Sequence, residues 1–443
     1  MAWGRSFRAA SKVYFERRLI IIFFMGFASG LPLVLTGNTL SWWMSEAGVT
    51  LTAIGLFALI GTPYNLKFIW APLIDRFSLP LLSRRLGRRR SWMVAIQVAL
   101  MASIVGLGVS SPENEPLVTA AMAFCVAFFS ASQDIVIDAY RIEILDDDQQ
   151  GAGAAMTQAG YRLGLIAAGA GALFLSKSVD WSLVYMAMAG LVLVGFLVAL
   201  YAPSPPINVA PNGTPESLGR RFKSAVVEPF HEFFTRNTAA NAFTILAFIL
   251  LYKLGDAYAG VMAYPFYFLI GFTVDEIIVV SKFFGVGATL VGVFIGGVAV
   301  MRYGVLPCLL VFGVFQMFSN LMYAAQAAIG PEVSFLFLTI GIENLSGGLG
   351  SAAFIAYLSL LCNRAYTGTQ FALFTSFMAV GRTLLASSSG WLADQTGWVT
   401  FFVASTGVAL PGLILLLWMM KNLPMAVQSG HAGVEEDREP PIT

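Results

Sequence analysis

The chain carries little charge for its length. Of its 443 residues, 12% are Asp, Glu, Lys or Arg, about half the share of an ordinary soluble domain. Hydrophobic residues make up 57% of the chain and the mean hydropathy is +0.75. This composition excludes a soluble globular domain and indicates a membrane protein. The net charge of +1 identifies no partner by itself, and we expect no nucleic-acid partner.

Cysteine and histidine are also scarce. The three cysteines lie in apolar segments without CxxC or Cys/His spacing, so we expect neither a disulfide framework nor a zinc site. Both histidines, His231 and His431, fall outside the apolar segments. The acidic run Asp146–Asp148 is more typical of a solvated loop than of a metal site. We therefore expect no metal and no cofactor.

Common catalytic motifs are absent from the sequence. HExxH, GxSxG and GxxxxGK[ST] do not occur, which argues against a metalloprotease, a hydrolase and an ATP-driven pump. A membrane-embedded acyl- or glycosyltransferase is a different functional class, but it would need an acid/base or metal set at one interface. The apolar segments contain no histidine for such a set, so we expect a protein that is not an enzyme.

Long apolar runs dominate what is present. Runs of about 18 to 28 residues predict an all-α membrane protein with twelve transmembrane helices. The runs are 19–44, 51–74, 92–110, 117–141, 151–177, 181–201, 239–269, 275–300, 305–328, 333–361, 367–391 and 398–421.

One long polar connection divides these runs. Residues 202–238 are rich in Pro, Asn, Gly and charge, which predicts a cytoplasmic linker between two six-helix halves, 1–201 and 239–425. Residues 426–443 are acidic and proline-containing and are expected to form a disordered cytoplasmic tail. Twenty basic residues fall on one side of the predicted helices and Lys177 alone on the other, so both termini are expected in the cytoplasm.

The two halves resemble copies of each other. Four residues of the first half recur 217 residues later, and Gly48–Leu51 matches Gly271–Val274 at a separation of 223. The four pairs are Tyr140 with Tyr357, Gly151 with Gly368, Gly164 with Gly381 and Trp181 with Trp398. A parallel duplication of six helices predicts a major facilitator fold of two pseudo-symmetric halves.

A charged stripe interrupts the fourth apolar run. On a helix, Ser130, Asp134, Asp138 and Arg141 share one narrow face, because steps of three and four residues return to the same side. Ionisable residues inside a membrane span are costly and often functional. Asp134 lies deeper than Asp138 and has no base one turn away, so we rank it first as a proton carrier. The alternative for Asp134 is a structural role in helix packing.

The second half lacks this stripe but carries its own charges. At the offset of 223, the Gly-Leu-Pro of Gly30–Leu33 falls on Lys253–Asp256, and both stretches lie near the middle of their helices. We expect a break or kink at Gly30–Leu33 and an internal ion pair between Lys253 and Asp256. Broken helices and charge at mid-depth mark the binding sites of transporters.

Acids and bases balance inside the predicted spans, so mutual neutralisation is the structural alternative for each of them. The acids are Asp134, Asp138, Asp256 and Glu343, and the bases are Lys67, Arg162, Lys253 and Arg382, with Lys282 nearer a helix end. Three glycine pairs, Gly26 with Gly30, Gly160 with Gly164 and Gly292 with Gly296, predict close helix contacts.

Several runs resemble one known family. They are Gly30–Gly37, Trp43–Gly48, Gly61–Arg76, Ser132–Arg141 and Tyr252–Ala257. Together they resemble the AmpG family of bacterial muropeptide permeases, and the resemblance extends from about residue 20 to 420. The Gln-Asp-xxx-Asp pattern within Ser132–Arg141 is similar to that of eukaryotic acetyl-CoA transporters as well, so the runs in the first, second and seventh helices favour AmpG.

The resemblance implies proton-driven import of GlcNAc-1,6-anhydroMurNAc and its peptides across the bacterial inner membrane. In that family this import serves peptidoglycan recycling and feeds β-lactamase induction. A related facilitator for another cargo, such as acetyl-CoA or a sugar, is the alternative. The partners expected are the anhydromuropeptide, protons and membrane lipid, and the chain is expected to be a monomer.

Roles for individual residues follow from these patterns. Asp134 is the expected proton carrier, with Asp256 or Glu343 as the alternatives, and residues 1–200 are expected to rock against 239–425 around a cavity at the midplane. The expected substrate-binding residues are Gly30, Tyr64, Gln133, Tyr161, Arg162, Lys253, Asn344, Gln370 and Arg382. Arg162, Lys253 and Arg382 are expected to recognise carboxylates.

A cytoplasmic gate is expected between the second and third helices. Asp75-Arg76 and Gly87–Arg90 resemble the facilitator loop at this place, although Phe77–Leu86 is a longer insertion than usual. We predict that Asp138 and Arg141 contact the Asp75-Arg76 loop as part of this gate.

Overall fold

The computed structural model describes residues 12–50, 53, 57–205, 218–386 and 388–423, and nearly all of them are helical. The chain divides into two compact units. Among the described residues, the N-terminal unit comprises those of 12–205 and Arg364–Ser376, and the C-terminal unit comprises those of 218–363 and 377–423. Helix α19 (Thr367–Ala386) therefore begins in the N-terminal unit and ends in the C-terminal unit.

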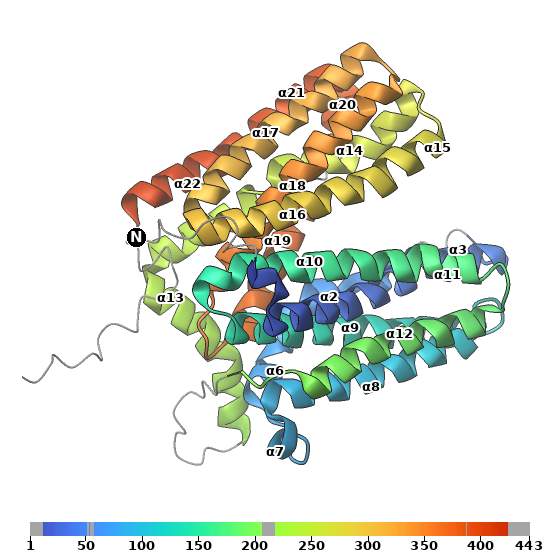
Figure 1. Ribbon diagram of the computed structural model, residues 1–443, viewed down its shortest axis with the longest axis vertical. Coiled ribbons are helices and arrows are strands. Elements are labelled where there is room, and N and C mark those ends of the chain that lie inside the picture. The colour runs from blue at the N-terminus through green and yellow to red at the C-terminus, as the bar shows by residue number, and fades with distance from the viewer. Residues whose placement is uncertain (1–11, 51–52, 54–56, 206–217, 387, 424–443) are drawn as a thin grey trace, which may run out of the picture. The chain divides into compact units, whose positions relative to one another are not determined.

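The N-terminal unit is a bundle of long helices joined by short helical segments (Figure 1). The long helices are α2 (Arg17–Thr36), α8 (Arg88–Val109), α9 (Pro116–Ile144), α10 (Gln150–Ile166) and α12 (Trp181–Tyr201). The short segments are η1 (Val13–Phe15), α3 (Asn38–Glu46), η2 (Ala58–Gly61), α5 (Thr62–Leu66), η3 (Lys67–Ile69), α6 (Ala71–Arg76), α7 (Ser83–Leu86), η4 (Asp147–Gln149), η5 (Ala167–Gly171) and α11 (Ala172–Leu175). Helix α2 packs against α10, α9 and α12, and α8 packs against α9 and α12.

The first predicted helix is interrupted, but not where the sequence suggested. Helix α2 continues through Gly30 and Pro32 and ends at Thr36, and Gly37 separates it from α3 with φ −103° and ψ −110°. The expected break at Gly30–Leu33 is therefore misplaced. Pro32 lies inside α2, where it cannot donate an N–H to the Ala28 carbonyl one turn earlier, and the helix ends four residues later.

Ten described helices or runs of helices are long and apolar enough to span a membrane. The two predicted spans that are missing from these ten are 51–74 and 151–177. The first consists of short segments from η2 to α6, with parts of 51–56 outside the described residues. The second is α10 followed by the π-helical turn η5 and by α11. Both regions are helical but lack one continuous apolar α-helix.

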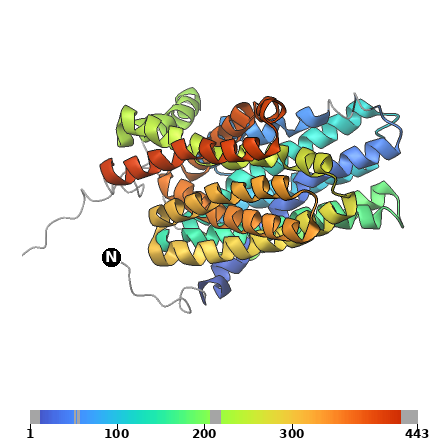
Figure 2. The same ribbon diagram turned by 90° about the horizontal axis from the view of Figure 1, so that it is seen from above.

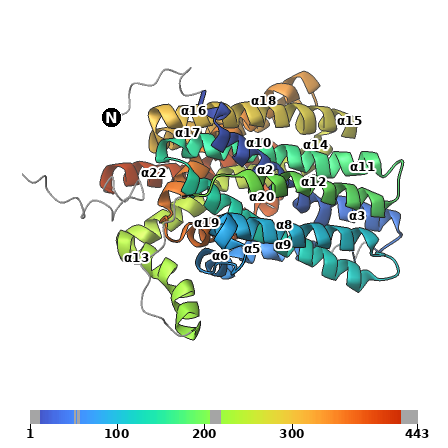
Figure 3. The ribbon, with the colours of Figure 1, turned by 60° about the horizontal axis from the view of Figure 1, so that its bottom comes forward.

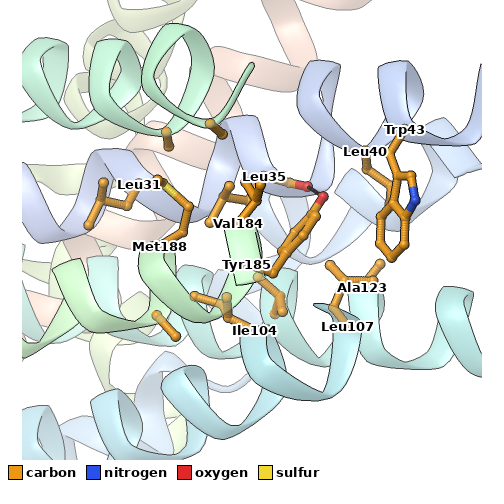
Figure 4. Packing of buried hydrophobic residues seen from close by; sticks show 14 of the residues in the cluster. Leu31, Leu35, Leu40, Trp43, Ile104, Leu107, Ala123, Val184, Tyr185 and Met188 are labelled. Carbon is orange, nitrogen blue, oxygen red and sulfur yellow. Dashed lines mark hydrogen bonds between the residues drawn. The ribbon is translucent and has the colours of Figure 1, made fainter. Parts of the chain in front are cut away.

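The core of the N-terminal unit lies between α2, α3, α8, α9 and α12 (Figure 4). Trp43, Tyr185 and Leu35 illustrate its packing. The Trp43 and Tyr185 rings lie 5.3 Å apart, and the buried Tyr185 hydroxyl donates to the Leu35 carbonyl at 2.9 Å. This hydrogen bond satisfies a polar group that would otherwise be costly to bury.

The C-terminal unit is a second helical bundle, whose yellow and orange helices run side by side in Figures 1 and 2. Its long helices are α13 (Leu218–Leu251), α14 (Leu254–Ile270), α16 (Gly285–Tyr303), α17 (Val305–Ile329), α18 (Val333–Leu361), α21 (Trp398–Val408) and α22 (Leu410–Asn422). The short ones are α15 (Val274–Ile277), η6 (Ile278–Phe284) and α20 (Ser389–Thr396). Residues 218–238 of the expected linker belong to α13, which is kinked at Thr238 (φ +58°).

Glycine pairs set the closest helix contacts in both units, as the sequence predicted. A Cβ on Gly30 would collide with the Tyr161 carbonyl, and a Cβ on Gly160 would collide with the Phe23 carbonyl, so α2 and α10 touch backbone to backbone. A Cβ on Gly292 would collide with the Leu345 carbonyl, so α16 and α18 do the same. Small residues at these contacts let neighbouring helices approach closely within a membrane.

Candidate functional site

Helix α9 carries the charged stripe of the N-terminal unit. It begins at Pro116, where the missing N–H of proline costs nothing, and ends at Ile144, before an extended Leu145. The helix therefore runs three residues past the expected end at Arg141. The extension brings Glu143 onto the helix, a residue that the sequence analysis did not consider.

Asp134 is partly buried and engaged by a neighbouring helix. Ser29 of α2 donates its hydroxyl to Asp134 Oδ1 at 2.5 Å. The charges of Lys67 and Asp138 also act on Asp134, and Lys67 itself is only 8% exposed. Asp134 therefore lies between helices, and the charge of Lys67 on η3 influences it although the two groups form no ion pair. Spacing along α9 alone could not show this neighbour.

Several buried polar groups on α5, α9 and α10 have no protein partner in the described part of the chain. Among the described residues, no hydrogen-bond partner is present for the buried Tyr64 hydroxyl, the Ser130 hydroxyl, either amide atom of Gln133, or Arg162 Nε. The charge of Asp134 acts on Tyr64, and the Tyr64 hydroxyl lies beside Ser130 and Thr36 without forming a hydrogen bond of good geometry. Buried polar atoms are nearly always paired, so these groups are exceptions that lack a partner within the part of the protein described.

Two predicted substrate residues, Gly30 and Tyr161, meet at the α2–α10 contact. Helix packing explains why residue 30 is glycine, because only glycine fits against the Tyr161 backbone. The charge of Asp134 acts on the Tyr161 ring as well, so Tyr161 lies near the acid. Contact of either residue with a substrate stays a prediction.

The C-terminal unit places its charges at a helix break. Helix α13 ends at Leu251 and α14 begins at Leu254, with Lys253 between them. Lys253 Nζ donates to Asp256 Oδ2 at 3.2 Å and to Gln316 Oε1 at 2.8 Å. The predicted ion pair is confirmed, and Gln316 of α17 is a third member that the sequence gave no signal to find. A Cβ on Gly350 would lie 2.6 Å from Gln316 Oε1, so this glycine leaves room for the group.

Glu343 and Asn344 form a second polar group on α18. Asn344 Nδ2 donates to Glu343 Oε2 at 2.8 Å and to the Ile340 carbonyl at 3.0 Å. Thr289 of α16 donates its hydroxyl to Asn344 Oδ1 at 2.8 Å. The amide of Asn344 thus links Glu343 to the neighbouring helix.

Asp75 holds the start of α19 within the N-terminal unit. Its carboxylate accepts the backbone N–H of Gly368 at 3.2 Å and both the N–H and the hydroxyl of Thr369 at 2.6 Å. The same carboxylate pairs with Arg89 at 2.7 Å. A carboxylate at a helix N-terminus satisfies N–H groups that lack partners inside the helix. Figure 3 shows α6, which carries Asp75, beside α8 and α9.

Arg89 joins this cap to the end of α9. It makes a two-pronged contact with Glu143, with distances of 2.5 to 3.1 Å, and donates to the Thr367 hydroxyl at 2.9 Å. Thr367 in turn donates to Glu143 Oε1 at 2.6 Å. We call Asp75, Arg89, Glu143, Thr367 and Thr369 the buried network.

Arg141 was predicted to contact the Asp75-Arg76 loop. The part of this prediction that concerns Asp75 is wrong. Asp75 takes Arg89 and the start of α19 as its partners, and Arg89 also contacts Glu143 at the end of α9. Arg141 is fully buried, lies 3.5 Å from Asp138, and stacks over the Phe371 ring at 5.2 Å. Arg141 thus contacts α19 as well, but through an aromatic ring. Arg76 is exposed.

Two further predicted residues lie on α19. Gln370 is 1% exposed and belongs to the segment grouped with the N-terminal unit. The side chain of Arg382 lies outside the described part of the chain. No group of three or more potential metal ligands occurs among the described residues.

Two bundles of long apolar helices that carry charged residues inside their spans are typical of membrane transporters. The family model "Major Facilitator Superfamily" matches residues 19–324. The proton:xylose symporter XylE has a similar fold, with a TM-score of 0.61, 12% identity and coverage of 96% of this chain and 97% of XylE. The human organic anion transporter MFSD10 matches with a TM-score of 0.55, 16% identity and coverage of 93% and 100%. The chain is thus a multi-pass membrane protein of the major facilitator superfamily.

Curated relatives narrow this class further. The anhydromuropeptide permease of Escherichia coli K12 is 40% identical over 414 residues, covering 93% of this chain and 82% of that protein. A putative transporter named AmpG 4 from Rickettsia felis is 32% identical and covers 93% and 99%. The chain belongs to the anhydromuropeptide permease (AmpG) family, and the expected fold and family are confirmed. These relatives are named as permeases or transporters, not as enzymes.

Proposed function

We propose that this protein is a proton-coupled transporter that imports anhydromuropeptides, GlcNAc-1,6-anhydroMurNAc and its peptides, across the bacterial inner membrane. The observation that carries the proposal is the 40% identity to a permease of that name over nearly the whole chain. In the cell this import would return wall fragments for peptidoglycan recycling and feed β-lactamase induction. The chain would act as a monomer in lipid, with both termini in the cytoplasm.

Asp134 is the proposed proton carrier. Ser29 holds its carboxyl between α2 and α9, and unpaired polar atoms of Tyr64, Ser130 and Gln133 lie on the elements around it. Asp256 and Glu343 are the alternative carriers, but Asp256 is bonded to Lys253 and Glu343 to Asn344. A carboxyl without a close base can exchange its proton without breaking an ion pair.

Alternating access is the proposed mechanism, with residues 1–200 rocking against 239–425. The start of α19 is the proposed gate element, because Asp75 and the rest of the buried network fix it to the N-terminal unit while its remainder belongs to the C-terminal unit. Movement of the halves would require these hydrogen bonds to open or α19 to bend. Asp138 and Arg141, through Phe371, support the same segment.

The experiment that tests the cargo is uptake of labelled anhydromuropeptide into membrane vesicles that contain this protein. Unlabelled anhydromuropeptide is expected to compete, whereas acetyl-CoA and simple sugars at the same concentration are not. Vesicles without the protein give the background. Uptake that acetyl-CoA or a sugar inhibits better than anhydromuropeptide would assign the chain to another cargo.

A further inference from the structure

Lys67 is a buried base without a close counter-ion. It begins η3, a single turn between α5 and α6, and is 8% exposed. Its side chain forms no hydrogen bond and no ion pair with any residue in the described part of the chain. A lysine held inside a membrane domain in this way is costly unless an anion reaches it.

The surrounding structure fixes where Lys67 lies. Trp70, three residues further on, donates its indole N–H to the Ser132 hydroxyl of α9 at 2.9 Å, and its ring packs on Phe128 at 4.9 Å. Segment η3 also contacts α9 directly. Ser132 lies two residues before Asp134, so Lys67 is held beside the stretch of α9 that carries the unpaired hydroxyl and amide groups of Ser130 and Gln133.

Asp134 does not serve as a close partner for this base. The two groups influence each other electrostatically but are not within ion-pair distance, and Asp134 is already hydrogen-bonded to Ser29. A second anion can therefore bind Lys67 without displacing a protein carboxylate. The neighbouring unpaired amide and hydroxyl groups are suited to the oxygen and nitrogen atoms of a sugar or a peptide.

Lys253, which the sequence suggested for carboxylate recognition, differs in this respect. Its ammonium group is bonded to Asp256 and Gln316 and lies 6.0 Å from the centre of the Tyr252 ring. A substrate carboxylate at Lys253 would compete with Asp256. The two lysines thus have opposite states: Lys253 is neutralised inside the protein and Lys67 is not.

We propose that Lys67 binds a carboxylate of the transported substrate, within a polar subsite completed by Tyr64, Ser130 and Gln133. This inference rests on the proposed function, since it concerns the same substrate. Every anhydromuropeptide has such a group: the lactyl carboxylate in the peptide-free sugar, or the carboxylates of the peptide. The lysine would thereby distinguish these compounds from neutral sugars of similar size.

The test is a binding comparison on the purified, membrane-reconstituted protein. The probes are peptide-free GlcNAc-1,6-anhydroMurNAc and the same disaccharide with its lactyl carboxylate converted to a carboxamide. The unmodified protein is expected to bind the acid at least tenfold more tightly than the amide, because a charge-assisted hydrogen bond is lost in the amide. Lys67→Gln is expected to bind both probes with affinities within about threefold of each other.

Matched variants separate this role from a structural one. Lys253→Gln removes the partly buried, ion-paired lysine that is the alternative carboxylate site, and it is expected to keep the preference for the acid. Lys67→Arg is expected to keep the preference because it retains the cation. Thermal unfolding of each variant checks folding, and Lys67→Met replaces Lys67→Gln if the latter does not fold.

Three results have distinct meanings. A Lys67→Gln protein that keeps the tenfold preference, or loses affinity for both probes equally, would overturn the proposal. Loss of the preference in Lys253→Gln instead would assign carboxylate recognition to Lys253. An unmodified protein that binds neither probe would contradict the proposed function itself, whatever the variants do.

Discussion

At the scale of single residues, two sets of charges inside the predicted spans are arranged differently, one set in each unit. In the C-terminal unit, Lys253, Asp256 and Gln316 form a closed group in which each charge has a partner. In the N-terminal unit, Asp134 has a hydroxyl partner and Lys67 has none among the described residues. A closed ion pair resists protonation, whereas an acid held by a hydroxyl can gain and lose a proton at lower cost. The N-terminal unit is therefore where we expect the chemistry of coupling.

The first prediction concerns Asp134. Asp134→Asn is expected to fold and to exchange labelled for unlabelled anhydromuropeptide across a membrane, but not to concentrate it. One proton crossing a potential of about 100 mV supplies about 2.3 kcal/mol, which corresponds to about fiftyfold accumulation. Accumulation in the variant should fall to about onefold. Asp256→Asn is the comparison, and accumulation that persists in Asp134→Asn while it is lost in Asp256→Asn would move the carrier to Asp256.

The second prediction concerns the Lys253–Asp256 pair. Lys253→Met leaves Asp256 without its base and is expected to lower the free energy of unfolding by about 2 kcal/mol, because a desolvated charge loses its partner. The double variant Lys253→Met with Asp256→Leu should recover most of this loss. Thermal unfolding in detergent measures the stability of the single and the double variant. Equal loss in the single and double variants would show that the two side chains stabilise the protein independently.

At the scale of helices, backbone contact between α2 and α10 brings Tyr161 against α2, the helix whose Ser29 bonds Asp134 of α9. The contact depends on Gly26, Gly30, Gly160 and Gly164, since a Cβ at any of them would meet backbone atoms of the other helix. The site geometry is thus a consequence of glycine spacing on two helices far apart in the sequence.

Gly160→Ala tests this contact. The new methyl group would collide with the Phe23 carbonyl, so we expect the free energy of unfolding to fall by about 1–3 kcal/mol and coupled uptake to decrease. Gly190→Ala in α12 is the matched control, because a Cβ there meets nothing within 4 Å. A Gly160→Ala protein as stable and active as Gly190→Ala would show that α2 and α10 can separate without effect.

The start of α19 provides the fourth prediction. Asp75→Asn keeps an acceptor oxygen but loses the negative charge that Arg89 and the N–H groups of Gly368 and Thr369 share. Hydrogen bonds to a charged group contribute about 1.5–3 kcal/mol, so amide exchange of these two N–H groups should become at least about tenfold faster.

Arg364→Gln is the control for that measurement. Arg364 lies just before α19 and forms an ion pair with Asp147, which this variant removes. Both side chains are 43% exposed, so little change in amide exchange is expected. Unchanged exchange in Asp75→Asn would mean that the Asp75 charge does not hold α19.

The sequence predicted the helices better than their interruptions. Apolar runs indicated most helices within a few residues, since length and hydropathy decide where a membrane helix forms. The break at Gly37 and the partner of Asp75 depend on tertiary packing, which no local pattern encodes. The Lys253–Asp256 pair was predictable because both residues lie on one helical face, whereas Gln316 and Ser29 belong to other helices and gave no signal.

At the scale of the whole molecule, the chain has a major facilitator fold, and its duplication stays a prediction from the sequence. The family model, the solved structures and the curated relatives agree on a major facilitator fold. Within that fold the two units differ: one has an ion pair at a helix break, and the other has an acid and a separate lysine. A difference of this kind suits a transporter in which one half carries the coupling residue.

The most direct test is uptake by the purified protein in liposomes with an imposed proton gradient. We expect labelled anhydromuropeptide to accumulate when the outside is more acidic and the accumulation to collapse on addition of a protonophore. Liposomes containing Asp134→Asn should reach equal concentrations on both sides under either condition. Accumulation that is the same with and without the gradient, or no uptake of anhydromuropeptide by the unmodified protein, would contradict proton-coupled muropeptide transport.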